Sequence, residues 1–166
     1  MAPKYVRESN NKILAVLFLQ AFATSVCASC ELAQASPTDL LARGAYLARI
    51  TGCIGCHTPR TRDGAVLEDR LLSGGDHTIA GDLGRVYPPN VTPDKETGLG
   101  AWQLADIVKA LKTGMTPEGH ILSTAMPWRT QYDQLSDSDA LAIAIYLKSL
   151  PPIRNSVPLA HTTPKP

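Results

Sequence analysis

Aromatic residues are scarce in this chain, and neither sign of charge is in clear excess. Phe, Trp and Tyr make up only 5% of its 166 residues, so it has few of the large side chains that usually fill a core. The 16 Lys and Arg residues nearly balance the 15 Asp and Glu residues. This balance argues against nucleic-acid binding, which usually leaves a basic surface. No internal repeat is evident, and the length fits one domain with a modest core.

A long uninterrupted apolar run is also missing. Three basic residues precede an apolar segment, residues 13–19, which continues beyond Gln20 and is followed by small residues. This order is typical of an export signal, so we expect residues 1–35 to be a signal peptide, cleaved after Ala28 or after Ala35, and the mature protein to be periplasmic. An uncleaved membrane anchor is the alternative, although the run is shorter than the ~20 residues that a spanning helix needs.

The four cysteines form two Cys-x-x-Cys pairs, Cys27/Cys30 and Cys53/Cys56, and His57 directly follows the second pair. The run Cys-x-x-Cys-His is the sequence form of covalent c-type haem attachment. Its two thiols bond to one porphyrin, while the imidazole is placed to bind the iron. We therefore predict one haem c, attached through both cysteines of the second pair, with the histidine as an axial ligand. The haem would supply apolar core mass that the aromatic residues do not.

Two other uses of the cysteines remain as alternatives. A zinc site of four thiolates is possible, but the gap between the pairs is longer than usual and zinc gives no role to His57. A thioredoxin-like redox disulfide between Cys53 and Cys56 would need a preceding strand, whereas residues 43–50 predict a helix.

Three helices are predicted. The first begins at Ser36, in a capping box with proline at the first helical position, and ends at Gly52. The second covers residues 102–112, and the third runs from residue 136 to residue 150, where two prolines follow. Because Gly44 has no side chain, we expect the third helix to approach the first helix closely at that residue, beside Tyr46. The sequence thus predicts an all-α fold.

The segments between and after the helices differ in character. Residues 58–89 are polar and contain glycine, and we expect an ordered loop that wraps the edge of a cofactor. Residues 153–166 are a proline-rich tail, either strapped to the surface or mobile. The folded domain is therefore predicted to span residues 36–152.

A haem iron that carries electrons needs a second axial ligand, which is commonly a methionine thioether. Met126 is the predicted ligand, because the following Pro127 prevents a helix and favours a loop that presents the sulfur. Met115 is the second choice. His120 is close enough in sequence to replace Met126 if the sulfur is displaced.

Three further residues are candidates for contact with the haem or its ligands. Residues 87–89 predict extended backbone, and we expect a carbonyl of this strand, with Pro89 the candidate, to accept a hydrogen bond from the second ring nitrogen of His57. Trp102 and Arg129 are predicted to reach the propionates. A core position for Trp102 and a surface position for Arg129 explain these two residues equally well.

Several motifs occur in an order that is familiar from one group of proteins. The motifs are Arg43-Gly-Ala-Tyr-Leu47, Gly52-Cys-Ile-Gly-Cys-His-Thr58, Leu72-Ser-Gly-Gly75, Tyr87-Pro-Pro-Asn-Val-Thr-Pro-Asp94, Thr97-Gly-Leu-Gly-Ala-Trp102, Ala125-Met-Pro-Trp128 and Leu135 to Pro152. With these motifs, from about Arg43 to Pro152, the chain resembles the single-haem modules of the cytochrome c subunits of periplasmic dehydrogenases that oxidise alcohols, gluconate, aldehydes or N-heterocycles.

The resemblance implies a class I cytochrome c fold, in which three or more helices and long ordered loops wrap one haem, with His57 and Met126 as axial ligands. It also implies electron transfer without catalysis: the protein would accept electrons from a dehydrogenase and pass them to a respiratory carrier, such as a downstream cytochrome or an oxidase. Many of the resembling subunits hold three modules and a membrane anchor, whereas this sequence has one haem motif. The alternative function is a haem protein with a labile distal ligand, acting as a gas sensor or a peroxidase, although only His120 and Arg129 suggest a distal acid–base pair.

Overall fold

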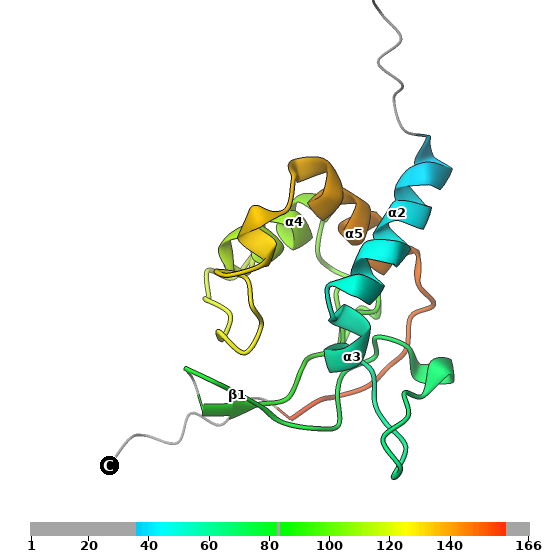
Figure 1. Cartoon of the computed structure of the whole chain (residues 1–166), viewed down its shortest axis with the longest axis vertical. Coiled ribbons are helices and arrows are strands. Elements are labelled where there is room, and N and C mark those ends of the chain that lie inside the picture. The colour runs from blue at the N-terminus through cyan, green and yellow to red at the C-terminus, as the bar shows by residue number, and fades with distance from the viewer. Residues whose placement is uncertain (1–35, 83, 159–166) are drawn as a thin grey trace, which may run out of the picture. The chain divides into compact units, whose positions relative to one another are not determined.

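The computed structural model describes residues 36–82 and 84–158 of the chain. The predicted signal peptide with both cleavage sites and the Cys27/Cys30 pair lie outside the described residues. In the described part, four α-helices surround a core, and the other regular elements are two single-turn 3₁₀ helices and one short hairpin (Figure 1). The elements are α2 (Pro37–Ile50), α3 (Cys53–His57), η1 (Glu68–Arg70), β1 (Ile79–Gly81), β2 (Gly84–Val86), α4 (Leu104–Thr113), η2 (Tyr132–Gln134) and α5 (Asp137–Ser149).

The predicted all-α fold is confirmed, with the hairpin as a minor addition. Within the described residues, no helix combines the length and the apolar character needed to cross a membrane.

Helix α2 begins and ends where its sequence predicts. The Ser36 hydroxyl accepts a hydrogen bond from the Asp39 amide at 3.1 Å, and the Asp39 carboxylate accepts one from the Ser36 amide at 3.1 Å. This is a complete capping box with Pro37 at the first helical position. After the helix, Gly52 has a φ of 91°, a left-handed conformation that glycine adopts without strain. The chain therefore turns sharply just before Cys53.

The close packing of the first and last helices is also confirmed, and Figure 1 shows α2 beside α5. A Cβ atom added at Gly44 would collide with the Ala142 carbonyl oxygen and lie 2.8 Å from the Tyr146 Cβ. Ile143 of α5 is fully buried at this interface, as part of the core. Tyr46 differs from the expectation, because 54% of its surface is exposed. The glycine alone therefore permits the approach.

Helix α4 starts two residues later than predicted. Gln103 is its N-cap residue, and the Gln103 amide donates to the Asp106 carboxylate at 2.8 Å, so Trp102 lies before the helix. The helix ends at Gly114, whose φ is 71°. A Cβ there would lie 2.6 Å from Cδ2 of the Trp128 indole, so this glycine both ends the helix and makes room for the ring.

Lys148 joins α5 to the loop that precedes α4. Its ammonium group donates hydrogen bonds to the carbonyl oxygens of Leu99, Gly100 and Trp102, each at 3.0 Å. These carbonyl groups lie outside the helices, so they have no regular helical hydrogen bonds, and the lysine donates to them instead. Periodicity places this residue at the end of the helix but gives no indication of the contact.

An ordered loop was predicted over residues 58–89, and the structure has in addition the 3₁₀ turn η1 and a short hairpin there. Strands β1 and β2 pair antiparallel, with Ile79 opposite Val86 and Gly81 opposite Gly84. Each strand has three residues, which is too short to show the alternating pattern that identifies a strand in a sequence.

As far as Pro158, the tail is bound to the surface of the domain, which is the first of the two alternatives given for it. The Asn90 side-chain amide donates to the Ile153 carbonyl at 2.7 Å, and the Asn155 side-chain amide donates to the Ser73 carbonyl at 2.8 Å.

Asn90 also begins an Asn-x-Thr sequon, but only 2% of its surface is exposed. It is therefore not accessible for glycosylation in the folded protein.

Aspartates that accept hydrogen bonds make the stability of this fold sensitive to acid. A hydrogen bond from Arg43 lowers the pKa of Asp139, and hydrogen bonds from Thr97 lower the pKa of Asp94. A pKa that is lowered in the folded state stabilises the fold above the unfolded value of 3.8 and ceases to do so as the pH falls through the folded value. We expect urea unfolding to give a lower free energy of unfolding at pH 3 than at pH 6. An Asp139→Asn variant should lose part of this difference, and an equal difference in both proteins would contradict the assignment.

Candidate haem-binding site

The two thiols expected to hold a haem lie on the single turn of helix α3. Cys53 and Cys56 are both free, and they are three residues apart, a spacing that puts both side chains on one side of a helix. Cys53 is buried, with 7% of its surface exposed, while Cys56 is half-buried. Burial raises the pKa of the Cys53 thiol. The left-handed Gly52 starts this turn directly after α2, and thus fixes where the thiols lie relative to the core.

His57 ends the same turn and is held by a backbone carbonyl. Its Nδ1 atom lies 2.7 Å from the Pro89 carbonyl oxygen, so the hydrogen bond expected from the extended strand is present. Because a carbonyl only accepts, Nδ1 carries the proton and donates, which leaves the Nε2 lone pair free. Burial lowers the pKa of His57 and favours the neutral ring. A neutral ring, fixed in orientation through its other nitrogen, is the form in which histidine binds a metal.

The segment Leu72–Gly75 holds the backbone around His57. The Gly74 amide donates to the His57 carbonyl at 2.7 Å, and the Leu72 amide donates to the Thr58 hydroxyl at 3.0 Å. A Cβ at Gly75 would lie 2.5 Å from the Cys56 carbonyl oxygen. The backbone of the Leu-Ser-Gly-Gly motif therefore packs closely against the turn Cys53–His57, which we call the attachment turn.

Tyr132, in η2, also contacts the attachment turn, and sequence reasoning missed it. Its hydroxyl donates to the Thr51 carbonyl at 2.9 Å and lies 4.0 Å from the Cys53 sulfur. Burial raises the pKa of Tyr132, so the phenol remains a donor at neutral pH. The only sequence signal was an aromatic residue six positions after Met126, which does not reveal its partner.

Removing the Tyr132 hydroxyl should weaken this link. In Tyr132→Phe the ring still fills its place, but the Thr51 carbonyl loses a donor, so we expect the free energy of unfolding to fall by about 1 kcal/mol. Urea unfolding of the haem-loaded protein measures the change. Tyr46→Phe is the matched control, because Tyr46 is exposed. Equal stability of the two variants would show that the buried hydrogen bond contributes nothing.

Met126 lies in a short irregular loop after α4, as its sequence context predicts. The Met126 carbonyl accepts a hydrogen bond from the Trp128 amide at 2.7 Å, and the Trp128 indole donates to the Leu122 carbonyl at 3.1 Å. The Met126 side chain is partly buried and packs against the core cluster that includes Cys53 and Ile54. The structure therefore places the methionine on the same core as the attachment turn.

The other candidate ligands lie elsewhere. Met115 forms an isolated β-bridge with Ile121 and is not among the described residues that pack against that core cluster. His120 is exposed, His77 is half-buried beside Asp76, and His161 lies outside the described residues.

Trp102 and Arg129, the two residues considered for propionate contacts, have different environments. Trp102 is partly buried and packs against the core cluster. Arg129 is exposed, and its guanidinium lies 4.6 Å from the centre of the Trp128 ring. The position of Trp102 fits the core alternative, and that of Arg129 fits the surface alternative. Contact of either residue with a propionate remains a prediction.

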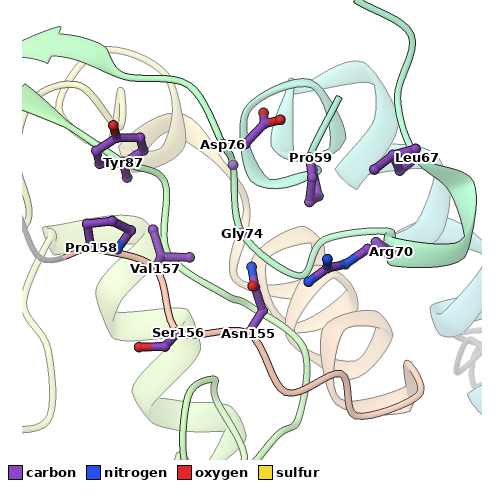
Figure 2. Close-up of a pocket in the computed structure, with 11 residues that line it drawn as sticks. Pro59, Leu67, Arg70, Gly74, Asp76, Tyr87, Asn155, Ser156, Val157 and Pro158 are labelled. Atoms are coloured by element: carbon purple, nitrogen blue, oxygen red, sulfur yellow. The ribbon is translucent and has the colours of Figure 1, made fainter. Parts of the chain in front are cut away.

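Figure 2 shows a surface groove that is lined in part by Gly74 and Gly75, which also contact the turn of Cys56 and His57. It measures about 390 Å³ and lies between the residue 59–76 segment and the strapped tail. Arg70, Asp76, Tyr87 and Asn155 are among its lining residues, and Cys53, Cys56, His57 and Met126 are not.

The donor set fits a covalently bound haem. Two free thiols and a neutral imidazole lie on one turn, and a methionine packs on the same core. In the described part of the chain, no group of three or more His, Cys, Asp or Glu residues could hold a metal ion without further ligands. An iron that arrives with its own porphyrin nitrogens needs only the axial ligands from the protein.

Comparisons with known proteins identify the family. The cytochrome c family matches residues 41–151. The chain is 35% identical over 122 residues to the cytochrome c subunit of a quinone alcohol dehydrogenase from Gluconobacter oxydans, covering 73% of this chain and 24% of the relative. It is 30% identical over 152 residues to a subunit of the nicotinate dehydrogenase from Pseudomonas putida, covering 84% and 12%. The cytochrome subunit of a fructose dehydrogenase from Gluconobacter japonicus is 36% identical over 107 residues, covering 64% and 20%.

The chain thus spans a quarter or less of the length of these relatives. The match includes the attachment turn, the extended segment at Pro89 and the Met126 loop. The chain therefore belongs to the cytochrome c family, and it is an electron-transfer module related to the cytochrome subunits of dehydrogenases.

Proposed function

We propose that the protein is a periplasmic monohaem cytochrome c that accepts electrons from a dehydrogenase and passes them to a respiratory carrier. The observation that carries the proposal is the neutral His57 ring, fixed by the Pro89 carbonyl immediately after two free thiols. The names of the relatives support a dehydrogenase as the donor.

Each residue of the site has a separate task in this proposal. Cys53 and Cys56 would hold one haem c through thioether bonds, and the His57 Nε2 and Met126 sulfur atoms would bind its iron. When bound, the haem supplies one iron that alternates between the ferric and ferrous states. The Pro89 carbonyl keeps the imidazole oriented. The methionine sulfur favours the ferrous state and so raises the reduction potential.

The chain is proposed to have three parts, of which the middle one carries out electron transfer. Residues 1–35 direct export to the periplasm, residues 36–152 form the cytochrome domain, and residues 153–166 form the tail. The acceptor is a downstream cytochrome or an oxidase. The protein associates with the membrane only if its N-terminal segment is not cleaved.

Haem loading can be tested by mass and absorbance. The full chain is expressed in a bacterial host with the haem-ligation machinery, and the periplasmic product is purified. We expect the mass of the mature polypeptide plus one haem, and a Soret band that survives denaturation. A double variant, Cys53→Ala with Cys56→Ala, should lose the covalent mass. A wild-type product with the mass of the bare polypeptide would refute the proposal.

The donor can be tested with the purified holoprotein. It is oxidised and mixed with alcohol, gluconate and fructose dehydrogenases from which the cytochrome c subunit has been removed, each with its substrate. Reduction by one of them at a rate that saturates with holoprotein concentration would support the proposed role. Equal, slow reduction by all three and by free substrate would argue against these donors.

A further inference from the structure

The tip of the β1–β2 hairpin is bound to the loop that carries Met126. The Asp82 carboxylate accepts hydrogen bonds from the Thr124 amide at 2.8 Å and from the Ser123 hydroxyl at 3.1 Å. The Asp82 amide in turn donates to the Thr124 hydroxyl at 3.1 Å. These three bonds join segments about 40 residues apart in sequence, and they reach the loop two and three residues before Met126.

The contact is close as well as polar. A Cβ atom added at Gly81 would collide with the Ser123 hydroxyl oxygen and lie 2.7 Å from the Ala125 amide nitrogen. The hairpin backbone therefore lies directly against the loop, with no room for a side chain between them. A shift of the loop outward would break all three Asp82 bonds together.

The two sides of Met126 are held in different ways. After Met126, the chain is anchored by Trp128, whose indole donates to the Leu122 carbonyl and lies against Gly114. Before Met126, the chain is held by the Leu122 amide, which donates to the Gly114 carbonyl at 2.8 Å, and by a turn in which the Met126 amide donates to the Ser123 carbonyl at 3.1 Å. The Asp82 bonds add the link between this part of the loop and the hairpin. The Thr124 amide lowers the pKa of Asp82, so the carboxylate is charged at neutral pH and is the stronger acceptor.

We propose that Asp82 is a positioning residue that holds the Met126 loop closed and so excludes other ligands from the sixth coordination position of the iron. The inference rests on the proposed function, in which Met126 is the axial ligand. An added ligand binds only to the fraction of molecules in which the loop is open, so its apparent affinity rises in proportion to that fraction. Weakening the hairpin contact should therefore change ligand access while leaving the haem attached.

The test uses the haem-loaded full chain and imidazole as the probe. Ferric protein is titrated with imidazole, and the thioether-to-iron absorption band is followed together with the reduction potential. We expect Asp82→Ala to raise the apparent affinity for imidazole about tenfold and to weaken the thioether band. Asp82→Asn keeps an oxygen that can accept both bonds, so it should show a smaller change. If Asp82→Ala does not fold, Gly81→Ala, which pushes the hairpin from the loop, should give the same increase.

The matched control is Asp94→Ala. Asp94 also accepts hydrogen bonds from backbone and hydroxyl groups, but within its own loop, at Glu96 and Thr97. An equal rise of affinity in this variant would show a general loosening and would overturn the role of Asp82. An unchanged affinity in Asp82→Ala, with a large rise in Met126→Ala, would overturn it while leaving the proposed function intact. An unchanged band in Met126→Ala would instead reject the ligand assignment itself.

Discussion

Met126→Ala is expected to lower the reduction potential by roughly 0.1 V or more, because axial ligands set potentials over ~0.8 V among haem proteins. The alanine has no sulfur to stabilise ferrous iron, so the ferric state becomes more stable relative to the ferrous state. The thioether absorption band should disappear, and the ferrous protein should bind carbon monoxide rapidly. Redox titration with dithionite and optical spectroscopy measure these changes.

Met115→Ala is the matched control for this prediction. Met115 precedes the same loop, but it pairs with Ile121 and is not among the described residues that pack on the core cluster of the attachment turn. We expect its band and potential to match the wild type. Loss of the band in Met115→Ala, with retention in Met126→Ala, would exchange the two assignments. Rapid carbon monoxide binding by the unmodified ferrous protein would favour the gas-sensor or peroxidase alternative.

Gly44→Ala is expected to destabilise the fold by about 2–3 kcal/mol, toward the upper end of the cost of overpacking. The added methyl group would collide with the Ala142 carbonyl oxygen, a backbone atom that cannot rotate away, and would also press on the Tyr146 Cβ at 2.8 Å. Alanine favours a helix over glycine by only about 1 kcal/mol, so the collision outweighs the gain. Urea unfolding of the holoprotein gives the free energy.

The control is Ala42→Leu, which adds a larger side chain to an exposed position of α2. We expect a change within about 0.5 kcal/mol there. If Gly44→Ala were as stable as the control, the helices would have room to separate, and the close approach would not be a requirement of the fold.

What the sequence predicted well is encoded over short distances. The capping box at Ser36, the stop at Gly52 and the attachment turn depend on neighbouring residues, so their patterns are visible without a structure. The approach at Gly44 was also predictable, because a glycine inside an apolar helix face leaves space for a neighbouring backbone. The Pro89 carbonyl was a natural partner for His57 because the paired prolines force an extended strand.

What the sequence did not predict depends on pairs of residues that are far apart. Tyr132 meets Thr51 across 81 positions, and Lys148 meets the carbonyl of Leu99 across 49 positions. An aromatic or a lysine at the end of an element looks the same in sequence whether or not it has a partner. The hairpin was missed for another reason: three-residue strands are shorter than one reliable period.

The pairing of the first and last helices has a consequence for the order of events during biogenesis. Arg43 and Asp139, which bond across this interface, are 96 positions apart, so the core cannot close until nearly the whole domain is available to fold. Closure over such a distance is slow compared with local helix formation. In the proposed export, the cysteines, only a few residues beyond the leading helix, emerge well before α5. We therefore expect the cofactor to be attached to an incompletely folded chain, before α5 packs against α2.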